Sequence, residues 1–385
     1  MDFNYSEAQQ EARQLADRIF TEQATHERLK EVEAAGGERG PFDERLWTSL
    51  ADAGLLGLGL PEDVGGAGLD FVATCLVLEA AGRTAAHVPV VETLVLGASC
   101  IDELGTAGQR QAWLPRVSAG EVTLTAALAE QVGDVVQTSL ERPATVATPE
   151  GDGWRLHGTK ACVPFGLRAD LVLVPATVGG DAAGGPIGIF LVDPTAPGVR
   201  RTRQDGPALP EALIELDGVA VGPQDRLGGP EADGGAALER TAQRTIAALC
   251  VTQSGVAASA LALTAAYAKT REQFGKVIAT FQAVGQRAAD AYVDAEAIRL
   301  TAWQAAWRLS EGLPASAELA VAKFWAADGG QRVVHAAAHL HGGVGVDRDY
   351  PLHRFFLRTH QIELTLGGAH ESLARLGAIL ADEPV

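Results

Sequence analysis

The stretch that decides the fold runs from Arg271 to Asp290 and reads REQFGKVIATFQAVGQRAAD. On both sides of it, Ala, Leu, Arg and Glu mix with apolar residues at three- and four-residue spacing, a pattern typical of α-helices. Gly275 interrupts this pattern and predicts a break between two long helices. The guanidinium of Arg271 matches phosphate oxygens in shape and charge, although an ordinary surface arginine at a helix end is the simpler interpretation of that residue alone.

A second block reads His341-Gly-Gly-Val-Gly345 and is followed by Tyr350-Pro351. Adjacent glycines allow backbone amides to approach a polar ligand closely, because no side chain stands in the way. A plain helix stop is the alternative interpretation of Gly342 and Gly343. Neither block decides a function by itself.

Three histidines near the second block, His335, His339 and His341, invite a metal hypothesis. No carboxylate has a matching spacing, so a helix surface or a subunit contact is the better interpretation, and no metal site is expected. The cysteines are scattered without a Cys-x-x-Cys pair, which indicates neither a zinc site nor a disulfide framework. They are Cys75, Cys100, Cys162 and Cys250.

Proline divides the chain, because it breaks helix interiors and is tolerated in turns and at strand edges. Eleven of the 18 prolines lie between Pro143 and Pro230, whereas none occurs from residue 231 to residue 313. The order predicts an α+β multidomain protein. We expect an N-terminal helical domain over 1–116, a middle β-barrel or sandwich-like domain over 117–230, and a C-terminal four-helix bundle over 231–385.

Local patterns predict the individual elements. Helices are expected at Ser6–Ala35, Phe42–Ala53, Leu69–Arg83 and Val91–Leu104, and strands at Val122–Leu128, Trp154–Leu156, Asp170–Val174, Ile187–Val192 and Ala212–Leu216. The Gly-rich segment Gly179–Pro186 is expected to form an exposed turn between two strands.

The charge balance excludes one class of function. With 49 acidic and 31 basic residues the formal charge is −18, which would repel a phosphate backbone, so nucleic-acid binding is not expected. No apolar run reaches the roughly 20 residues needed to span a bilayer, and the N-terminus is acidic and polar, unlike a signal peptide. We therefore expect no membrane span and a cytoplasmic location.

The two blocks resemble one known family. Arg271 to Gly275, Phe281-Gln282 and Ala289-Asp290 resemble the Arg-x-x-Phe-Gly, Gln and Ala-Asp signature of acyl-CoA dehydrogenases. The second block resembles that family's Gly-Gly-x-Gly and Tyr-Pro segment. Together with the order of helices, strands and helices, the resemblance covers essentially the whole chain and implies the acyl-CoA dehydrogenase fold, an oxidoreductase activity and FAD as cofactor.

In this family a flavin lies between the subunits of a tetramer. The resemblance places Arg271 on the flavin pyrophosphate, with Phe274 and Gln282 near the adenosine. The other candidate cofactor-binding residues that it implies are Phe281, His339, Gly342 and Gly343. In relatives these residues serve the flavin held mainly by a neighbouring subunit, and that half of the site looks intact in this chain.

The catalytic base is missing. Dehydrogenation of an acyl thioester requires a carboxylate beside the α-carbon while a hydride leaves the β-carbon for the flavin. Most relatives supply a Glu from a Tyr-Glu-Gly-Thr-like motif, and that position falls on Leu366 here. Other relatives place the base on the first helix of the last domain, where this chain has Thr245. No catalytic residue is therefore predicted.

Two acids lie near the position of the missing base, Glu363 and Glu371. Glu363 is one turn before Leu366, about 4.5 Å along a helix, and is the weak candidate for a displaced base. A solvated helix carboxylate is the alternative. Arg240 and Arg244 are candidates for contacts with CoA only because they lie close to Thr245.

The middle domain also departs from the family. The threonine that would contact the flavin falls on Ala129, and the Trp and Thr usually offered to the flavin ring are replaced by Cys162 and Pro164. Residues that this chain would lend to a neighbour's flavin persist, whereas those for its own flavin do not. This pattern suggests a division of labour with a paralogous partner.

The stretch from His341 to Arg354, with Leu366-Gly-Gly368, resembles the non-catalytic chain of heteromeric bacterial dehydrogenases that act on steroid side-chain thioesters. In that subgroup two unlike chains form an α2β2 tetramer with half the usual flavins. The alternatives are a self-sufficient homotetramer with a displaced base and a flavin-free scaffold of the same fold. The resemblance also implies an acyl-CoA substrate and an electron-transfer flavoprotein as acceptor.

Overall fold

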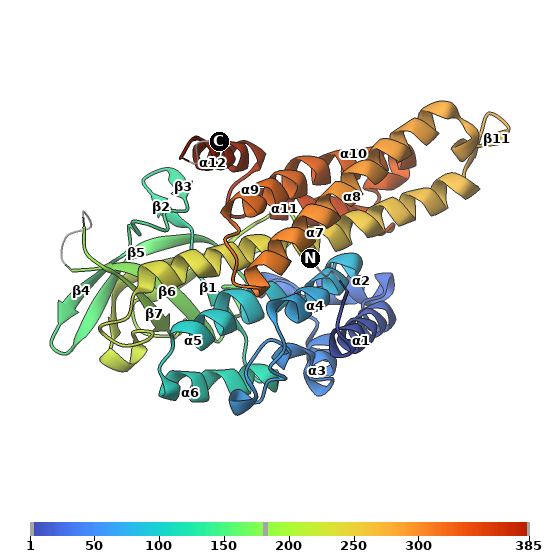
Figure 1. Ribbon diagram of the computed structural model, residues 1–385. Coiled ribbons are helices and arrows are strands. Elements are labelled where there is room, and N and C mark those ends of the chain that lie inside the picture. Colours follow the sequence, from blue (N-terminus) through green and yellow to red (C-terminus); the bar gives the residue numbers. More distant parts are fainter. Residues whose placement is uncertain (1–3, 180–183, 383–385) are drawn as a thin grey trace. The chain divides into compact units, whose positions relative to one another are not determined.

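The computed structural model describes residues 4–179 and 184–382 (Figure 1). Helices come first, a β-sheet follows, and helices return at the end, which confirms the predicted order. The turn expected at Gly179–Pro186 lies partly outside the described residues.

The chain forms two compact units that are interleaved in sequence. One unit combines residues up to Lys30, Phe71–His87 and the chain from Ile246 onward, and the other combines Glu31–Asp70 with Val88–Thr245. The first helices of the chain therefore pack with the last ones. The three predicted domain ranges, 1–116, 117–230 and 231–385, do not coincide with these two units and stay a prediction.

The N-terminal part is helical, as predicted, but two expected helices differ in detail. The segment expected as one helix over residues 6–35 is two, because the backbone leaves the helix at Ala24. The segment at residues 91–104 begins as a π-helix, Val91–Ala98. The α-helices are α1 (Glu7–Gln23), α2 (His26–Ala35), α3 (Glu44–Asp52), α4 (Phe71–Thr84), α5 (Ser99–Leu104) and α6 (Ala107–Ser118).

A nine-stranded sheet forms the middle of the chain, so the predicted β domain is confirmed. The strands are β1 (Leu124–Ala126), β2 (Glu130–Val132), β3 (Val135–Gln137), β4 (Val146–Glu150), β5 (Gly153–Pro164), β6 (Leu171–Val178), β7 (Ile187–Val192), β8 (Val199–Gln204) and β9 (Glu211–Val221). They pair in the order β1-β6-β4-β5-β2-β3, with β7 on β6, β9 on β5 and β8 on β9. A cluster of buried apolar side chains that includes Leu156, Phe190 and Ile214 holds this sheet together.

The C-terminal bundle consists of long helices that lie side by side (Figure 1). They are α7 (Gly234–Thr270), α8 (Gln282–Ser310), α9 (Ser316–Phe324), a π-helical turn (Trp325–Gly329), α10 (Gly330–His341), α11 (Leu352–Leu364) and α12 (Ala369–Asp382). Because α9 and α10 continue through the π-helical turn, α7, α8, α9–α10 and α11 correspond to the four predicted bundle helices. The predicted break at Gly275 separates α7 from α8.

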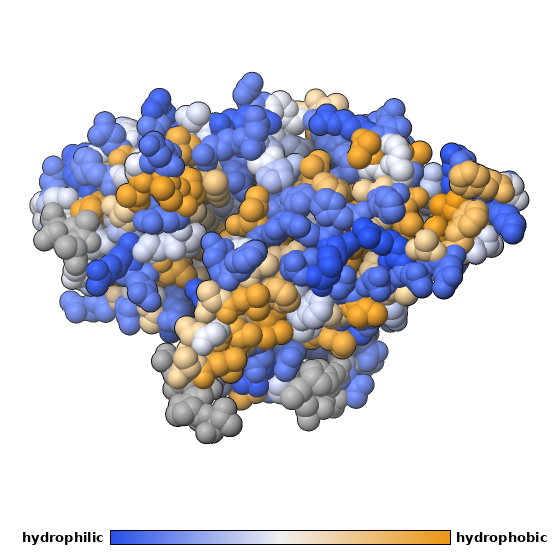
Figure 2. All heavy atoms as spheres, turned by 90° about the horizontal axis from the view of Figure 1, so that it is seen from above, coloured by the Kyte–Doolittle hydropathy of each residue, from blue (hydrophilic) through white to orange (hydrophobic). Residues whose placement is uncertain are grey.

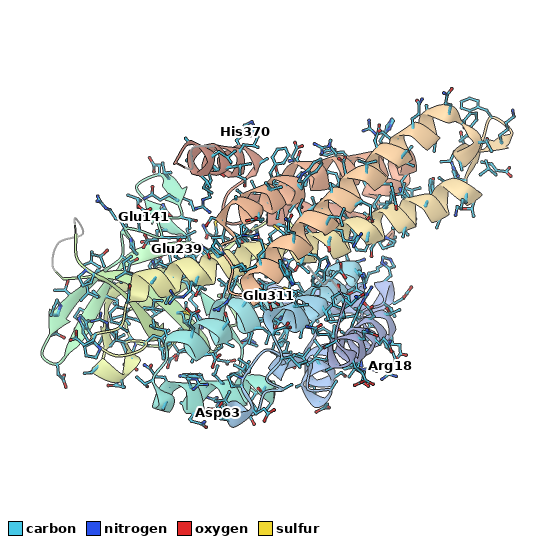
Figure 3. The ribbon with its side chains drawn as sticks, viewed as in Figure 1. Arg18, Asp63, Glu141, Glu239, Glu311 and His370 are labelled. Atoms are coloured by element: carbon cyan, nitrogen blue, oxygen red, sulfur yellow. The ribbon has the colours of Figure 1, made fainter. Side chains whose placement is uncertain are left out.

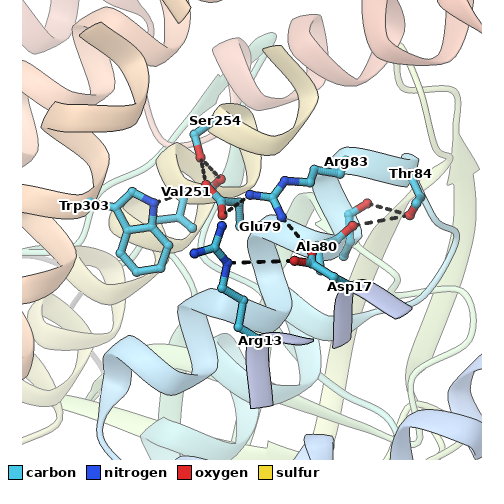
Figure 4. A network of polar contacts seen from close by, with 10 residues as sticks. Arg13, Asp17, Glu79, Ala80, Arg83, Thr84, Val251, Ser254 and Trp303 are labelled. Atoms are coloured by element: carbon cyan, nitrogen blue, oxygen red, sulfur yellow. Dashed lines mark hydrogen bonds and ion pairs between the residues drawn. The ribbon is translucent and has the colours of Figure 1, made fainter. Parts of the chain in front are cut away.

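Helices α4 and α7 pack with their backbones in close contact. A Cβ at Gly82 would lie 2.1 Å from the carbonyl oxygen of Thr252, and a Cβ at Gly255 would lie 2.2 Å from that of Glu79. The buried Glu79 carboxylate accepts hydrogen bonds from Ser254 Oγ at 2.8 Å, Trp303 Nε1 at 3.2 Å and Arg83 at 2.6 Å (Figure 4). The buried carboxylate of Glu79 is therefore paired, as burial requires.

Among the described residues, α7 is long and apolar enough to cross a bilayer by length and composition. Most of its apolar window is buried inside the protein, as in the core helix of a globular protein. The charged side chains of Arg18, Asp63 and Glu141, which are labelled in Figure 3, are exposed.

Candidate functional site

The deciding stretch of sequence forms a tight hairpin at the end of α7. Strand β10 (Glu272–Gln273) pairs antiparallel with β11 (Lys276–Val277), which leaves Phe274 and Gly275 as a two-residue turn. Their φ angles are +54° and +73°, and positive values at both central residues are what a type I′ turn requires. Glycine adopts this conformation freely, whereas an aromatic residue does so at a steric cost.

That turn presents an aromatic side chain to its surroundings. Phe274 is 92% exposed and lies edge-on to the ring of Phe281, at a ring-centroid distance of 6.3 Å. Phe281 and Gln282 begin α8 directly after the hairpin, and Gln282 is exposed. Apolar atoms gather at the tip that carries β10 and β11 (Figure 2). A large exposed apolar group at the end of a helical hairpin indicates a binding surface.

Unpaired cations surround the same hairpin. Arg271 is exposed, and within residues 4–179 and 184–382 its guanidinium has no carboxylate partner. The same holds there for Lys269, Lys276 and Arg287, and Glu272 is the one acid between residues 269 and 287. In a chain with a net charge of −18, this local excess of positive charge suits a phosphate-bearing ligand.

The second block forms the turn after α10. Gly342 has φ +60° and ψ −138°, a combination that only glycine adopts readily. Gly342 and Gly343 are exposed, and no other atom lies within 4 Å of where a Cβ would stand on either. His339, on the last turn of α10, is also exposed. The side of the turn on which the glycine Cβ atoms would stand is therefore open to solvent, whereas the backbone N–H of Gly342 donates to the carbonyls of Ala338 and His339.

A stack of rings joins the two blocks. Tyr267, one helical turn before Arg271 on α7, stacks on His341 with a centroid distance of 4.4 Å and an interplanar angle of 25°. The hydroxyl of Tyr350 lies 3.1 Å from His341 Nε2. Two segments that are far apart in sequence are thus in contact through this ring stack.

At the position expected for the base, an apolar side chain packs against the core of the protein. Leu366 lies in the turn between α11 and α12 with φ +56°. Its side chain packs against the buried apolar cluster that includes Cys75, Ile246 and Cys250. Thr245 is buried, and its hydroxyl donates a hydrogen bond to the carbonyl of Thr241 at 2.7 Å. Neither residue is able to accept an α-proton.

Glu363 does not stand free in solvent. Its carboxylate accepts hydrogen bonds from Gln331 Nε2 at 2.5 Å and His360 Nδ1 at 3.2 Å, and its side chain is 18% exposed. The structure thus differs from the expectation of a solvated carboxylate, because two partners on α10 and α11 hold this side chain, and the role of displaced base stays a prediction. Glu371 is exposed and accepts a hydrogen bond from the backbone N–H of Gly368, which caps α12.

A buried lysine supports the same turn. Lys323 Nζ donates to the carbonyl oxygens of Ile362 at 2.5 Å and Glu363 at 3.1 Å, at the end of α11. Burial lowers the pKa of Lys323 to about 8, and the weaker influence of Cys250, Glu363 and Glu371 opposes this shift. Sequence reasoning missed this residue, although a lysine inside the apolar run LAVAKFW is a detectable signal.

The polar groups of the middle domain that would face a flavin of its own are absent or already used. Cys162 donates its backbone N–H to Gln204 Oε1 at 2.8 Å. Burial raises the pKa of its thiol to about 11, and the Glu211 carboxylate acts in the same direction. The carbonyl of Pro164 accepts from Thr125 Oγ1 at 2.7 Å, and Ala129 has no side-chain donor. These residues do not fit an isoalloxazine ring.

The arginines considered for CoA contacts are engaged as well. Arg240 and Arg244 both pair with the carboxylate of Glu103 on α5. In the described parts of the chain, no group of three or more His, Cys, Asp or Glu side chains is arranged to hold a metal ion.

Comparison with known proteins places this geometry in a family. The acyl-CoA dehydrogenase N-terminal domain profile matches residues 6–121, and the C-terminal domain profile matches residues 233–378. The chain belongs to the acyl-CoA dehydrogenase family. This family consists of oxidoreductases with FAD as cofactor, so the predicted fold, enzyme class and cofactor are confirmed at the level of the family.

Several relatives cover the whole chain. Acyl-CoA dehydrogenase FadE27 of Mycobacterium tuberculosis is 39% identical over 100% of both chains, and FadE28 of the same organism is 36% identical over 86% of this chain and 91% of its own. A crystal structure of the ChsE4-ChsE5 complex from that organism matches with 39% identity, 100% coverage of both chains and a TM-score of 0.90. A variant of the Tcur3481-Tcur3483 steroid acyl-CoA dehydrogenase matches with 46% identity, 98% coverage of both chains and a TM-score of 0.87.

Proposed function

We propose that this chain is the base-lacking subunit of a heteromeric acyl-CoA dehydrogenase and completes the FAD site of a paralogous partner. The observation that carries the proposal is the contrast between two regions of one chain. Leucine is packed into the position of the base, whereas the hairpin with Arg271 and Phe274 stays exposed and unpaired. A chain that catalysed the reaction on its own would need a base at the position of the leucine more than it would need an exposed hairpin.

The chemistry assigns a distinct task to each chain. Bound FAD accepts the hydride from the β-carbon of the acyl thioester, and the partner's carboxylate removes the α-proton. In this proposal Arg271 pairs with the pyrophosphate through its guanidinium fork, and the backbone at Gly342 and Gly343 approaches the cofactor closely because neither residue has a side chain. Phe274 covers the adenosine and excludes water from it.

The substrate and partners follow from the relatives by analogy. Two of the similar solved structures are described as a two-component complex and as a steroid acyl-CoA dehydrogenase, which supports an α2β2 assembly and a bulky, steroid-derived acyl-CoA. Another match, at 27% identity, is described as an electron-transferring flavoprotein of Acidaminococcus fermentans, which supports such a protein as the electron acceptor. We also propose a cytoplasmic location.

Flavin content tests this proposal directly. The chain is purified alone and after co-expression with each paralogue that has a Glu at the base position, and flavin absorbance is measured per chain together with acyl-CoA oxidation. We expect a colourless, inactive chain alone and about one flavin per unlike pair in the active complex. Arg271→Met should lower the flavin content of that complex, whereas Arg18→Met, on the exposed side of α1, should leave it unchanged.

Two other functions correspond to different outcomes of the same measurement. One flavin per chain together with turnover by the chain alone would support a self-sufficient homotetramer, and Glu363→Gln should then abolish turnover. The hydrogen bonds from Gln331 and His360 to Glu363 speak against that role. A complex without flavin would support a scaffold that retains the fold for assembly only.

A further inference from the structure

We propose that His341 is a positioning residue of the cofactor site, because its neutral imidazole fastens the Gly342–Gly343 turn to the end of α7 that carries Arg271. This inference rests on the proposed function, since it concerns the half of the flavin site that this chain lends to its partner. It goes further because it names His341 as the group that sets the geometry of this half of the flavin site and makes this half of the site sensitive to pH.

Contacts on both sides of the ring define its protonation state. His341 Nδ1 lies 2.8 Å from the carbonyl oxygen of Ala337, which accepts only, so Nδ1 carries a hydrogen. His341 Nε2 lies 3.1 Å from the Tyr350 hydroxyl, which donates to it when the ring is neutral. In that tautomer each ring nitrogen is engaged in one hydrogen bond.

The surroundings of the ring oppose a positive charge. His341 is buried, and the titratable groups that face it are Tyr267 from α7 and Tyr350 from the turn before α11. Burial lowers the pKa of His341 below its ordinary value, and the hydrogen bond to Ala337 only partly opposes that shift. Protonation would place a charge in this stack and reverse the hydrogen bond to Tyr350, whose hydroxyl oxygen would then have to accept from Nε2.

The same ring connects the two halves of the site. Tyr267 stacks on His341 and its hydroxyl lies 3.4 Å from the carbonyl oxygen of His341. The backbone N–H of Arg271 donates to the carbonyl of Tyr267 at 2.9 Å. A continuous path therefore runs from the Gly342 turn through His341 and Tyr267 to Arg271.

The glycines themselves supply no packing that could hold the turn. No atom beyond the neighbouring residues lies within 4 Å of a Cβ position on Gly342 or Gly343, so the turn is held by the hydrogen bonds from the Gly342 N–H to the carbonyls of Ala338 and His339 and by its flanks. On one flank stands His341, and on the other Gly345 packs so closely that a Cβ there would lie 2.9 Å from the carbonyl oxygen of Ala338. The orientation of the amides relative to Arg271 thus depends on His341.

A dependence on pH follows from the sign of the shift. Because the pKa of His341 in the folded chain is below its value in the unfolded chain, its contribution to stability is complete above the ordinary histidine range and is lost as the pH falls. We expect the assembled complex to release flavin as acidification protonates His341, since the Gly342 turn then loses its anchor.

Two measurements test this inference. Nuclear magnetic resonance of the histidine side chains in the isolated chain gives the tautomer and pKa of His341. We expect hydrogen on Nδ1 and, in Tyr350→Phe, a pKa raised by about half a pH unit or more, because the neutral ring loses a hydrogen-bond donor. The second measurement follows flavin fluorescence of the co-expressed complex during acidification, and Tyr350→Phe should release flavin at a correspondingly higher pH.

Two further variants complete the design. His341→Phe keeps an aromatic ring against Tyr267 but does not titrate, so its complex should lose the pH dependence of flavin release between about pH 5 and 7. His370→Phe, at an exposed position on α12 labelled in Figure 3, should keep the wild-type profile. An unchanged profile in His341→Phe, or an unchanged His341 pKa in Tyr350→Phe, would overturn the inference. A wild-type complex without flavin would instead overturn the proposed function.

Discussion

Lys323 is a buried cation whose hydrogen-bond acceptors are two backbone carbonyls and no carboxylate. Its ammonium group lies at the carboxyl end of α11, where the helix dipole places negative partial charge. This interaction keeps the lysine charged at neutral pH despite its burial. It also fixes the last turn before Leu366, and therefore the conformation of the segment that carries the base in catalytic relatives.

Replacing Lys323 should show how its titration changes the free energy of unfolding with pH. With a folded pKa of about 8 and an ordinary value of 10.5, the unfolded chain binds more protons than the folded chain between these pH values, so the stability contribution of Lys323 rises with pH. The free energy of unfolding of wild type, relative to Lys323→Met, should increase by about 1 kcal/mol from pH 7 to pH 9. Urea unfolding at several pH values measures this difference.

A matched control separates this effect from general pH dependence. Lys269 is an exposed lysine on α7. The free energy of unfolding of Lys269→Met should change with pH in the same way as that of the wild type. If the wild type and Lys323→Met differed by the same amount at pH 7 and pH 9, the lowered pKa would be wrong.

Sequence identified the residues whose role depends on local spacing, and missed those whose role depends on a tertiary contact. Arg271, Phe274 and Gly275 could be singled out because the hairpin that they form is local. The contact between Tyr267 and His341 spans 74 positions, and no periodicity encodes which helix faces which. For the same reason the partners of Glu363 on α10 and α11 could not be foreseen.

At the scale of elements, strand β2 is held to β5 mainly by one buried ion pair. Glu130 faces Lys160 across the two strands, and both side chains are 1% exposed. Burial raises the pKa of Glu130, but Lys160 and the hydrogen bonds from Thr145 and Ala144 outweigh it, so that pKa is lowered overall. Beyond this pair the β2–β3 hairpin exposes Val135 and its neighbours to solvent.

Replacing only one member of the Glu130–Lys160 pair should lower the free energy of unfolding. Lys160→Met leaves the Glu130 charge buried without its partner, and we expect a loss of about 3–5 kcal/mol in the free energy of unfolding. The double variant Glu130→Gln with Lys160→Met removes both charges and should be more stable than Lys160→Met alone. Denaturant unfolding compares the two variants. Equal stability would show that the pair contributes through packing rather than charge.

The strands that sequence missed lack the apolar alternation on which their prediction depends. Strand β8 reads VRRTRQ and pairs through its backbone with β9. Strands β2 and β3 are three residues each and mostly exposed. In contrast β7, whose run IGIFLV is almost wholly buried, coincides with its predicted bounds. A strand can be predicted from the sequence when at least one of its faces is buried.

At the scale of the whole molecule, α8 exposes an apolar stripe. Tyr292, Val293 and Leu300 are 58%, 63% and 58% exposed. In the proposed heteromer this stripe lies in the subunit interface, so Val293→Glu should weaken assembly with the partner by tenfold or more, at an expected cost of roughly 1–2 kcal/mol. Analytical ultracentrifugation of the mixed chains measures the association.

The controls for this prediction use the same helix and the isolated chain. Arg299→Glu, at an exposed position on α8, changes charge without removing apolar area and tests whether charge alone disturbs assembly. Circular dichroism of the Val293→Glu chain alone should match wild type, because the side chain of Val293 is 63% exposed. An unchanged association constant would place the interface elsewhere.

The interleaving of the two compact units has a consequence for how the chain is made. Helices α1 and α4 leave the ribosome early, yet they belong to the unit that closes only after residue 246. At ordinary rates of translation roughly ten to thirty seconds pass between the synthesis of residue 87 and that of residue 246. During this interval the unit that buries Phe20, Val77 and Leu78 is incomplete, so the nascent chain depends on protection against aggregation until its last third emerges.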